Sequence, residues 1–263
     1  MGDNEIKRRY LFTAVSLAVY VALKLGIPRL PLPHSPFGKV SLLLLSVLLF
    51  MAVQIALVRW VASLQIRPWV AGIAMAFGGS LFFAARKFHW PLGIGTELSL
   101  IVLLCMLGYL FSLILREPNL LLPAALFAPM FDIWTVFWGP AHTIMQKAPK
   151  VVEAVSTSVP APGSIKPISM IGPGDIVFLT LFFAAIYRFK MNDRRTYWFA
   201  LPLLVLTMTA VLKSASALPA LVPMGIAVIA ANWRLFKLTR QEKWSLAVVA
   251  LIVIGFVAFA ALR

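Results

Sequence analysis

Apolar runs of about 20 residues recur along the whole chain, and a helix of that length is what crosses the hydrocarbon core of a bilayer. Hydrophobic residues occupy 61% of the 263 positions, and the mean hydropathy is +0.92. The sequence therefore predicts an all-α fold, a polytopic bundle of transmembrane helices embedded in a lipid bilayer.

The apolar runs predict about nine spans, with proline and glycine clusters at their ends. The spans lie near residues 10–27, 40–64, 68–87, 95–115, 119–139, 173–190, 196–213, 217–236 and 244–262. One connection, 140–171, is long, and its stretch VPAPGSIKP indicates a mobile or extended segment rather than a helix. Nothing indicates a second folded domain, so residues 1–263 are predicted to form a single membrane domain.

Basic residues set the predicted orientation. They cluster between the apolar runs, notably in KRR (7–9) before the first span and RFKMNDRR (188–195) after the sixth. Cytoplasmic loops carry an excess of Lys and Arg, which predicts a cytoplasmic N-terminus and an exterior loop 140–171. No A-x-A cleavage site follows the first apolar run, so we expect that run to be retained as a span.

The net charge of +15 would suggest nucleic acid in a soluble chain, but here the charges anchor helix ends, and no nucleic-acid partner is expected. The one cysteine, Cys105, lies inside an apolar run and is interpreted as a packed thiol. His34, His89 and His142 lie in three separate loops without ligand spacing. The sequence therefore predicts neither a metal site nor a cofactor.

Two aspartates lie in membrane-length apolar segments, where an ionised carboxylate costs roughly 2.5–3.5 kcal/mol at a helix centre. Asp132 is in FAPMFDIWTVFWGP, seven residues before Gly139 and hence about 10 Å inside its span, and Asp175 is three residues after Gly172, at the start of the next. Consecutive helices are usually antiparallel neighbours, so we expect both carboxylates near one leaflet and able to meet.

Two carboxylates that share a site cannot both ionise cheaply, so one keeps a proton while the other stays charged. That is the state of an aspartic protease, in which the charged partner takes a proton from water and the protonated partner polarises the scissile carbonyl. Each aspartate also has a plainer interpretation: Asp175 as the cap of its helix, and Asp132 as a polar group bonded to a neighbouring helix.

The residues beside Asp175 suit the start of a helix. Gly172 and Gly174 allow close backbone approach and unusual dihedrals, and Pro173 fits a position whose amide would be unpaired. A different acid, Glu97, opens the fourth span and is interpreted as an interfacial acid in the first turn of its helix.

A third element, SALPALVPMG (216–225), carries prolines that keep the start of the eighth span irregular, which a membrane tolerates only where the segment lines a cavity or is buried in protein. In this order, the three elements resemble the presenilin and signal peptide peptidase family of GxGD intramembrane aspartyl proteases. One span separates the last two elements, as in that family, and the resemblance covers about residues 125–225. The matching positions are Asp132 for the first catalytic aspartate, Gly172, Gly174 and Asp175 for GxGD, and Pro219, Ala220 and Leu221 for PAL.

The resemblance implies cleavage, inside the bilayer, of single-span membrane proteins or signal-peptide-like substrates. Asp132 and Asp175 would be catalytic, and the PAL residues would shape the site and hold substrate. The compact chain suggests a prokaryotic homologue in a cell membrane. Phe131 stands where the family usually has tyrosine, Val222 separates PAL from Pro223, and a further span follows the PAL helix.

A peptide bond inside a helix is shielded by the helix's own hydrogen bonds, so the substrate must be unwound locally before it can be cleaved. The segment SIKPISMIG (164–172) could supply a strand edge that pairs with the unwound substrate. The alternative is that this segment is a plain tether. A proton-coupled transporter or channel would also explain two intramembrane acids. That alternative leaves the ordered PAL segment unexplained. A prepilin-peptidase-like enzyme also uses GxGD, but such enzymes lack the PAL motif. A non-catalytic scaffold would have no use for the two intramembrane acids. The sequence indicates no oligomeric state.

Overall fold

The computed structural model describes residues 3–88, 93–137, 147, 149–214 and 219–237, and beyond them 239–240, 243–244, 247–248, 251–252 and 255. The protein is mostly helical, as predicted. Among the described residues, five helices are long and apolar enough to cross a membrane. They are α1 (Asp3–Gly26), α2 (Pro36–Ser63), α3 (Pro68–Lys87), α4 (Gly93–Ser112) and α9 (Asp193–Ser214).

Four shorter helices are also described. They are α5 (Leu121–Phe137), α7 (Pro149–Val155), α8 (Pro173–Arg188) and α10 (Leu221–Asn232). Single 3-10 turns lie at Ile27–Arg29, Pro118–Leu120 and Trp233–Leu235. The last predicted span, 244–262, lies largely outside the described residues.

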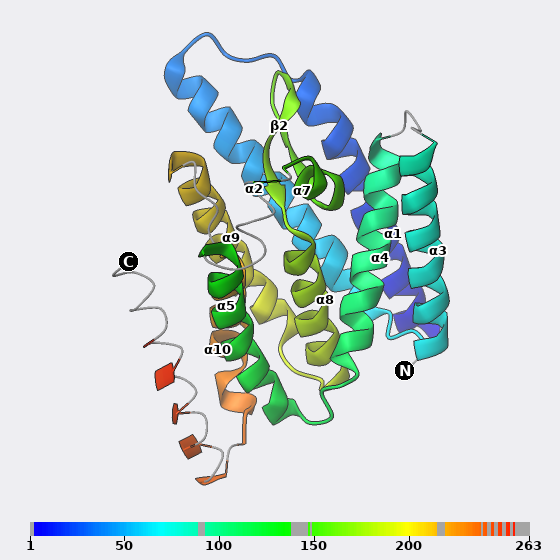
Figure 1. The fold of residues 1–263 in the computed structure, drawn as a ribbon, viewed down its shortest axis with the longest axis vertical. Coiled ribbons are helices and arrows are strands. Elements are labelled where there is room, and N and C mark those ends of the chain that lie inside the picture. Colours follow the sequence, from blue (N-terminus) through cyan, green and yellow to red (C-terminus); the bar gives the residue numbers. More distant parts are fainter. Residues whose placement is uncertain are drawn as a thin grey trace. The chain divides into compact units, whose positions relative to one another are not determined.

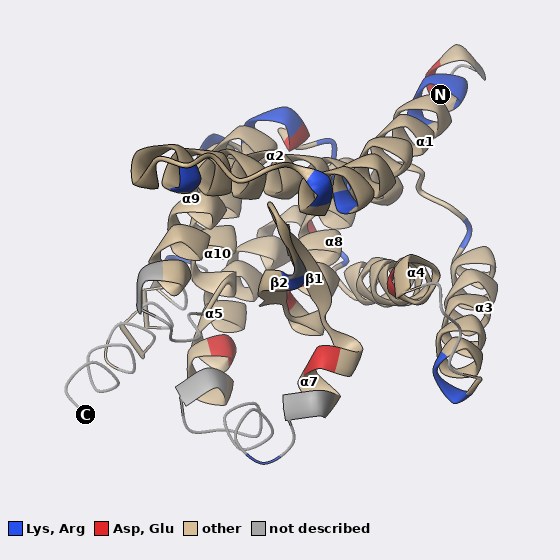
Figure 2. Ribbon diagram, turned by 90° about the horizontal axis from the view of Figure 1, so that it is seen from above, with Lys and Arg blue, Asp and Glu red and all other residues tan. Residues whose placement is uncertain are grey.

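Proline marks helix starts. Pro36 and Pro68 occupy the first helical positions of α2 and α3, where the missing amide proton is not needed. Ser35 caps α2, because its side chain accepts a hydrogen bond from the amide of Gly38 at 3.1 Å. Basic residues, blue in Figure 2, lie at the ends of helices such as α1 and α3, as expected where apolar spans meet water.

A β-hairpin interrupts the helical pattern and is the exception to the all-α prediction. Strand β1 (Thr157–Ala161) pairs antiparallel with β2 (Ser164–Ile171), and Gly163 in the turn has a φ of 67°, which favours glycine. The extended conformation expected for 164–172 is thus confirmed, whereas 149–155 form a helix that was not expected. The rest of the predicted connection, 140–146 and 148, lies outside the described residues.

The chain divides into two compact units, each described by itself. The first comprises Met1–Ser112 with Glu153–Ala184, and the second Leu113–Val152 with Ala185–Arg263. In the first, α1 packs on α2, α3 packs on α4, and β1 contacts α1, α2 and α4. In the second, α10 packs on both α5 and α9. The candidate aspartates belong to different units, Asp175 to the first and Asp132 to the second.

Large apolar side chains are exposed along the candidate spans. Phe77 and Phe83 of α3, for example, are 68% and 69% exposed, whereas Tyr20, Phe50 and Phe183 are fully buried in the interior of the first unit. Helices that are apolar on their outer as well as their inner face suit a lipid environment. The packing therefore agrees with the hydropathy, and membrane insertion is taken up below as part of the proposal.

Candidate active site

Asp132 lies on α5 and is hydrogen-bonded to the PAL segment. Its Oδ2 accepts the backbone N–H of Leu221 at 3.0 Å, and the carboxylate is half-buried. Leu221 is the first residue of α10, and the first N–H groups of a helix have no partner within the helix. Asp132 therefore satisfies one of these amides and complements the positive end of the helix dipole, so its plainer interpretation, a polar group bonded to a neighbouring helix, is present as well.

A close contact between two backbones brings these residues together. Pro129 in α5 has no N–H, so it cannot bond the carbonyl of Ala125 four residues earlier. That carbonyl lies against Gly225 of α10, where an added Cβ would overlap it and would lie 3.0 Å from Cγ of Pro129. Only glycine at this position lets α5 and α10 approach closely enough for the Asp132–Leu221 bond.

Asp175 lies in the first turn of α8, directly after β2 (Figure 1). Its Oδ2 accepts the backbone N–H of Gly172 at 3.1 Å. The side chain reaches back to the residue that precedes the helix, which is the acidic half of a capping box. The capping role weighed for Asp175 is thus present, and it holds the half-buried carboxyl group at the junction of strand and helix.

The glycines beside Asp175 do not have the geometry expected of them. Neither Gly172 nor Gly174 has a positive φ, and no described atom lies within 4 Å of where a Cβ on Gly174 would be. Gly172 would place its Cβ 3.4 Å from Oδ2 of Asp175, an ordinary contact. The expectation of strained dihedrals and close approach is therefore wrong within this unit.

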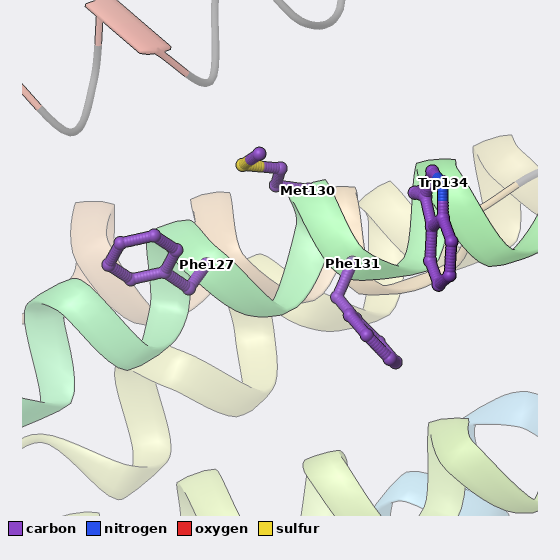
Figure 3. Close-up of a pocket in the computed structure, with 4 residues that line it drawn as sticks. All are labelled: Phe127, Met130, Phe131 and Trp134. Carbon is purple, nitrogen blue, oxygen red and sulfur yellow. The ribbon is translucent and has the colours of Figure 1, made fainter.

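Phe131 lies on the exposed side of α5. The side chain is 60% exposed, and its ring centroid is 5.7 Å from that of Trp134. With Phe127 and Met130, these residues line an apolar pocket of about 350 Å³ along two turns of the helix (Figure 3). The pocket offers apolar surface one residue away from Asp132. The other two PAL residues, Pro219 and Ala220, are half-buried ahead of α10.

A buried ion pair in the first unit was missed by sequence reasoning. Nζ of Lys24 on α1 lies 2.7 Å from Oε1 of Glu97 on α4, and the two side chains are only 9% and 11% exposed. The interpretation of Glu97 as an interfacial first-turn acid is corrected, since α4 is described from Gly93 and the carboxylate is buried. An available signal was Lys24 itself, a charge inside a predicted span.

No metal site is evident in the described part of the chain, where no group of three or more His, Cys, Asp or Glu side chains is placed to hold an ion. Comparisons with protein families, with curated proteins and with solved structures gave no match. The resemblance to the presenilin family therefore rests on the short motifs that contain Asp132, Asp175 and Leu221.

Proposed function

We propose that the protein is an intramembrane aspartyl protease that hydrolyses peptide bonds of transmembrane substrates. The hydrogen bond from Leu221 to Asp132 carries the proposal, because it joins two of the three elements by which the chain resembles the presenilin and signal peptide peptidase family. A carboxylate inside an apolar helix, fixed by the first amide of a second helix, is what a preorganised catalytic group requires.

In the proposed reaction, Asp132 and Asp175 act as a pair and share one proton. The charged carboxylate takes a proton from water, the resulting nucleophile attacks the scissile carbonyl, and the protonated carboxyl group hydrogen-bonds to the carbonyl oxygen. Backbone N–H groups of Leu221 and Gly172 orient the two carboxyl groups, and no metal or covalent intermediate takes part.

Strand β2 supports the proposal by offering an edge for an unwound substrate. Ser158 of β1 lies opposite Met170 of β2, but its N–H donates to Glu97 and its carbonyl accepts from Lys24. The pair is therefore of the non-hydrogen-bonded kind, and the backbone groups of Met170 point away from β1 as well. An extended substrate added at this edge would run toward Asp175, since β2 ends four residues before it.

Cleavage of a tagged single-span protein by purified protein in liposomes, read by mass spectrometry, tests the proposal. Asp132→Asn and Asp175→Asn keep an oxygen that can accept the bonds from Leu221 and Gly172, so we expect both to fold and neither to cleave. Asp193→Asn, at the start of α9, is the matched control and should remain active.

An aspartic-protease inhibitor with a transition-state isostere should bind wild type and fail to bind either variant. Substantial cleavage by Asp132→Asn or Asp175→Asn would remove the basis of the proposal. Proton-driven uptake that depends on both aspartates, without cleavage, would instead identify a transporter or channel.

The proposal includes the protein's place in the cell: about nine spans in a prokaryotic cell membrane, a cytoplasmic N-terminus and an exterior hairpin. Lys166 is exposed on β2, and Lys190 follows α8. With Cys105 replaced by alanine, an impermeant thiol reagent added outside intact cells should label Lys166→Cys and spare Lys190→Cys. The opposite pattern would reverse the orientation.

A further inference from the structure

The Lys24–Glu97 ion pair holds one residue of the hairpin from both sides. Nζ of Lys24 donates to the backbone carbonyl of Ser158 and, at 2.7 Å, to its Oγ. Oε1 of Glu97 accepts the backbone N–H of Ser158 at 2.7 Å. All three polar groups of Ser158 are thus bonded to the ion pair, through bonds that a charged partner makes shorter and stronger than neutral ones.

Neighbouring side chains fix the ion pair in place. Tyr20 on α1 donates its hydroxyl to Oε1 of Glu97 at 3.4 Å, and Nζ of Lys24 lies 5.3 Å from the centroid of the Phe50 ring. One residue earlier on β1, Oγ1 of Thr157 accepts a hydrogen bond from Gln54 of α2 at 3.3 Å. Strand β1 is therefore bound by side chains from three helices, and the ion pair is the charged part of that attachment.

The ion pair has a consequence for the two edges of the hairpin. A two-stranded sheet has two edges, and either can accept a further strand. At Ser158 the outer edge of β1 is occupied by Lys24 and Glu97, and a neutral peptide cannot match the charged donor and acceptor already there. Within the described residues, the outer edge of β2 carries no such attachment at Met170, whose backbone groups point outward by the register of the hairpin.

We propose that Lys24 and Glu97 are positioning residues that close the β1 edge and so direct a substrate strand to β2, beside Asp175. The inference rests on the proposed protease function. Both side chains act through the hairpin and contact neither the scissile bond nor water at the aspartates. This role accounts for two charges buried between α1, α4 and β1. Filling that space would not by itself require charged residues, since an apolar pair could occupy it.

The test compares the double variant Lys24→Met/Glu97→Met with Lys24→Arg and with Glu5→Gln. The double variant removes both charges, leaves no lone buried ion and keeps side chains of similar length. Lys24→Arg keeps the positive charge, and Glu5→Gln removes the exposed partner of Arg9 on α1 as a control. A photo-crosslinking group at position 170 reports substrate on the β2 edge, and one at position 161 reports substrate on β1.

We expect the double variant to fold with a lowered melting temperature, because the polar groups of Ser158 lose their charged partners. Its kcat should stay within about twofold of wild type, while KM rises about tenfold. Substrate crosslinking at position 170, measured in the inactive Asp175→Asn background, should fall about tenfold or spread to position 161. Lys24→Arg and Glu5→Gln should behave as wild type. An unchanged KM and unchanged crosslinking at position 170 in the double variant would overturn the inference.

Hydrogen exchange of the hairpin separates this inference from the proposed function. Faster exchange of amides 157–171 in the double variant, restored in Lys24→Arg, would establish the attachment even if the wild-type protein cleaved no substrate. Unchanged exchange would refute the attachment even if the wild-type protein were an active protease.

Discussion

The backbone amide of Leu221 donates a hydrogen bond to Oδ2 of Asp132 at 3.0 Å, across 89 positions of sequence. The bond gives a hydrogen-bond partner to a carboxylate that would otherwise be costly in an apolar helix. The donor is the first residue of α10, directly after Pro219 and Ala220. Leu221 therefore contacts Asp132 through its backbone, while its side chain is buried.

Leu221→Pro removes this donor at the first position of α10, and Ala220 before it has to leave its αR conformation, which a following proline disfavours. Leu221→Ala removes the same side chain and keeps the N–H. A hydrogen bond to a charged group contributes about 1.5–3 kcal/mol, so we expect kcat of the proline variant to be about 10- to 100-fold below that of the alanine variant in the substrate-cleavage assay. Equal kcat values would show that the amide of Leu221 has no part in orienting Asp132.

Gly108→Ala is expected to destabilise the first unit. An added Cβ would overlap the carbonyl of Val177 and lie 2.9 Å from Cβ of Thr180, so α4 and α8 would have to separate. Overpacking of this kind costs about 1–3 kcal/mol. Gly79→Ala is the matched control, since its Cβ would meet only Cδ1 of Leu103 at 3.5 Å.

Thermal unfolding in detergent checks this prediction, and activity gives a second measurement, because α8 carries Asp175 in its first turn. The expected order of stability is wild type and Gly79→Ala together, with Gly108→Ala below both. A Gly108→Ala protein as stable as the control would mean that α4 and α8 do not need their close contact.

Asn232→Leu should destabilise the second unit. Asn232 is fully buried, its Oδ1 accepts the N–H of Asn192 at 2.9 Å, and its Nδ2 donates to Oγ1 of Thr196 at 2.9 Å. Leucine would leave the Asn192 amide without its partner, at a cost of about 1–3 kcal/mol. The measurement is thermal unfolding of the purified protein in detergent.

The control for Asn232→Leu is Asn119→Ala, which removes a hydrogen bond to the carbonyl of Lys237 at the protein surface. Its effect should stay within about 0.5 kcal/mol. If both substitutions cost the same, the buried bonds of Asn232 do not stabilise the contact between α9 and α10.

Phe131→Tyr introduces the residue that the presenilin and signal peptide peptidase family usually carries at the position that Phe131 resembles. Because the ring is 60% exposed, the added hydroxyl needs no buried partner, and we expect activity within about twofold of wild type. The measurement is kcat/KM for the single-span substrate. A gain of tenfold or more would show that a hydroxyl at this position bonds a catalytic group.

Much of the architecture could be predicted because hydrophobicity repeats locally. Apolar runs define the helices, and the composition of SIKPISMIG indicates extended backbone, which is β2. The partner strand β1 could not be predicted in the same way, because pairing depends on contacts with α1, α2 and α4 that are remote in sequence.

The site was predictable to the extent that its groups belong to short motifs. Asp132 and Leu221 lie in two of these motifs and are hydrogen-bonded to each other. The charge of Lys24 inside a predicted span was a signal, but nothing in the nearby sequence identifies its partner Glu97, 73 positions away. A lysine near the end of a span is typical of one that extends to the interface, so the sequence does not distinguish it from a buried partner. The dihedrals of Gly172 and Gly174 were wrongly expected, because an acidic side chain caps this helix without strain.

The contact of Gly225 with the Ala125 carbonyl leaves no clearance for sliding between α5 and α10. A shift along either axis would force the next side chain of α10 into the backbone of α5. In the proposed protease, Asp132 and Leu221 would therefore move together as one rigid piece, and a hinge that admits substrate would have to lie outside the contact between α5 and α10.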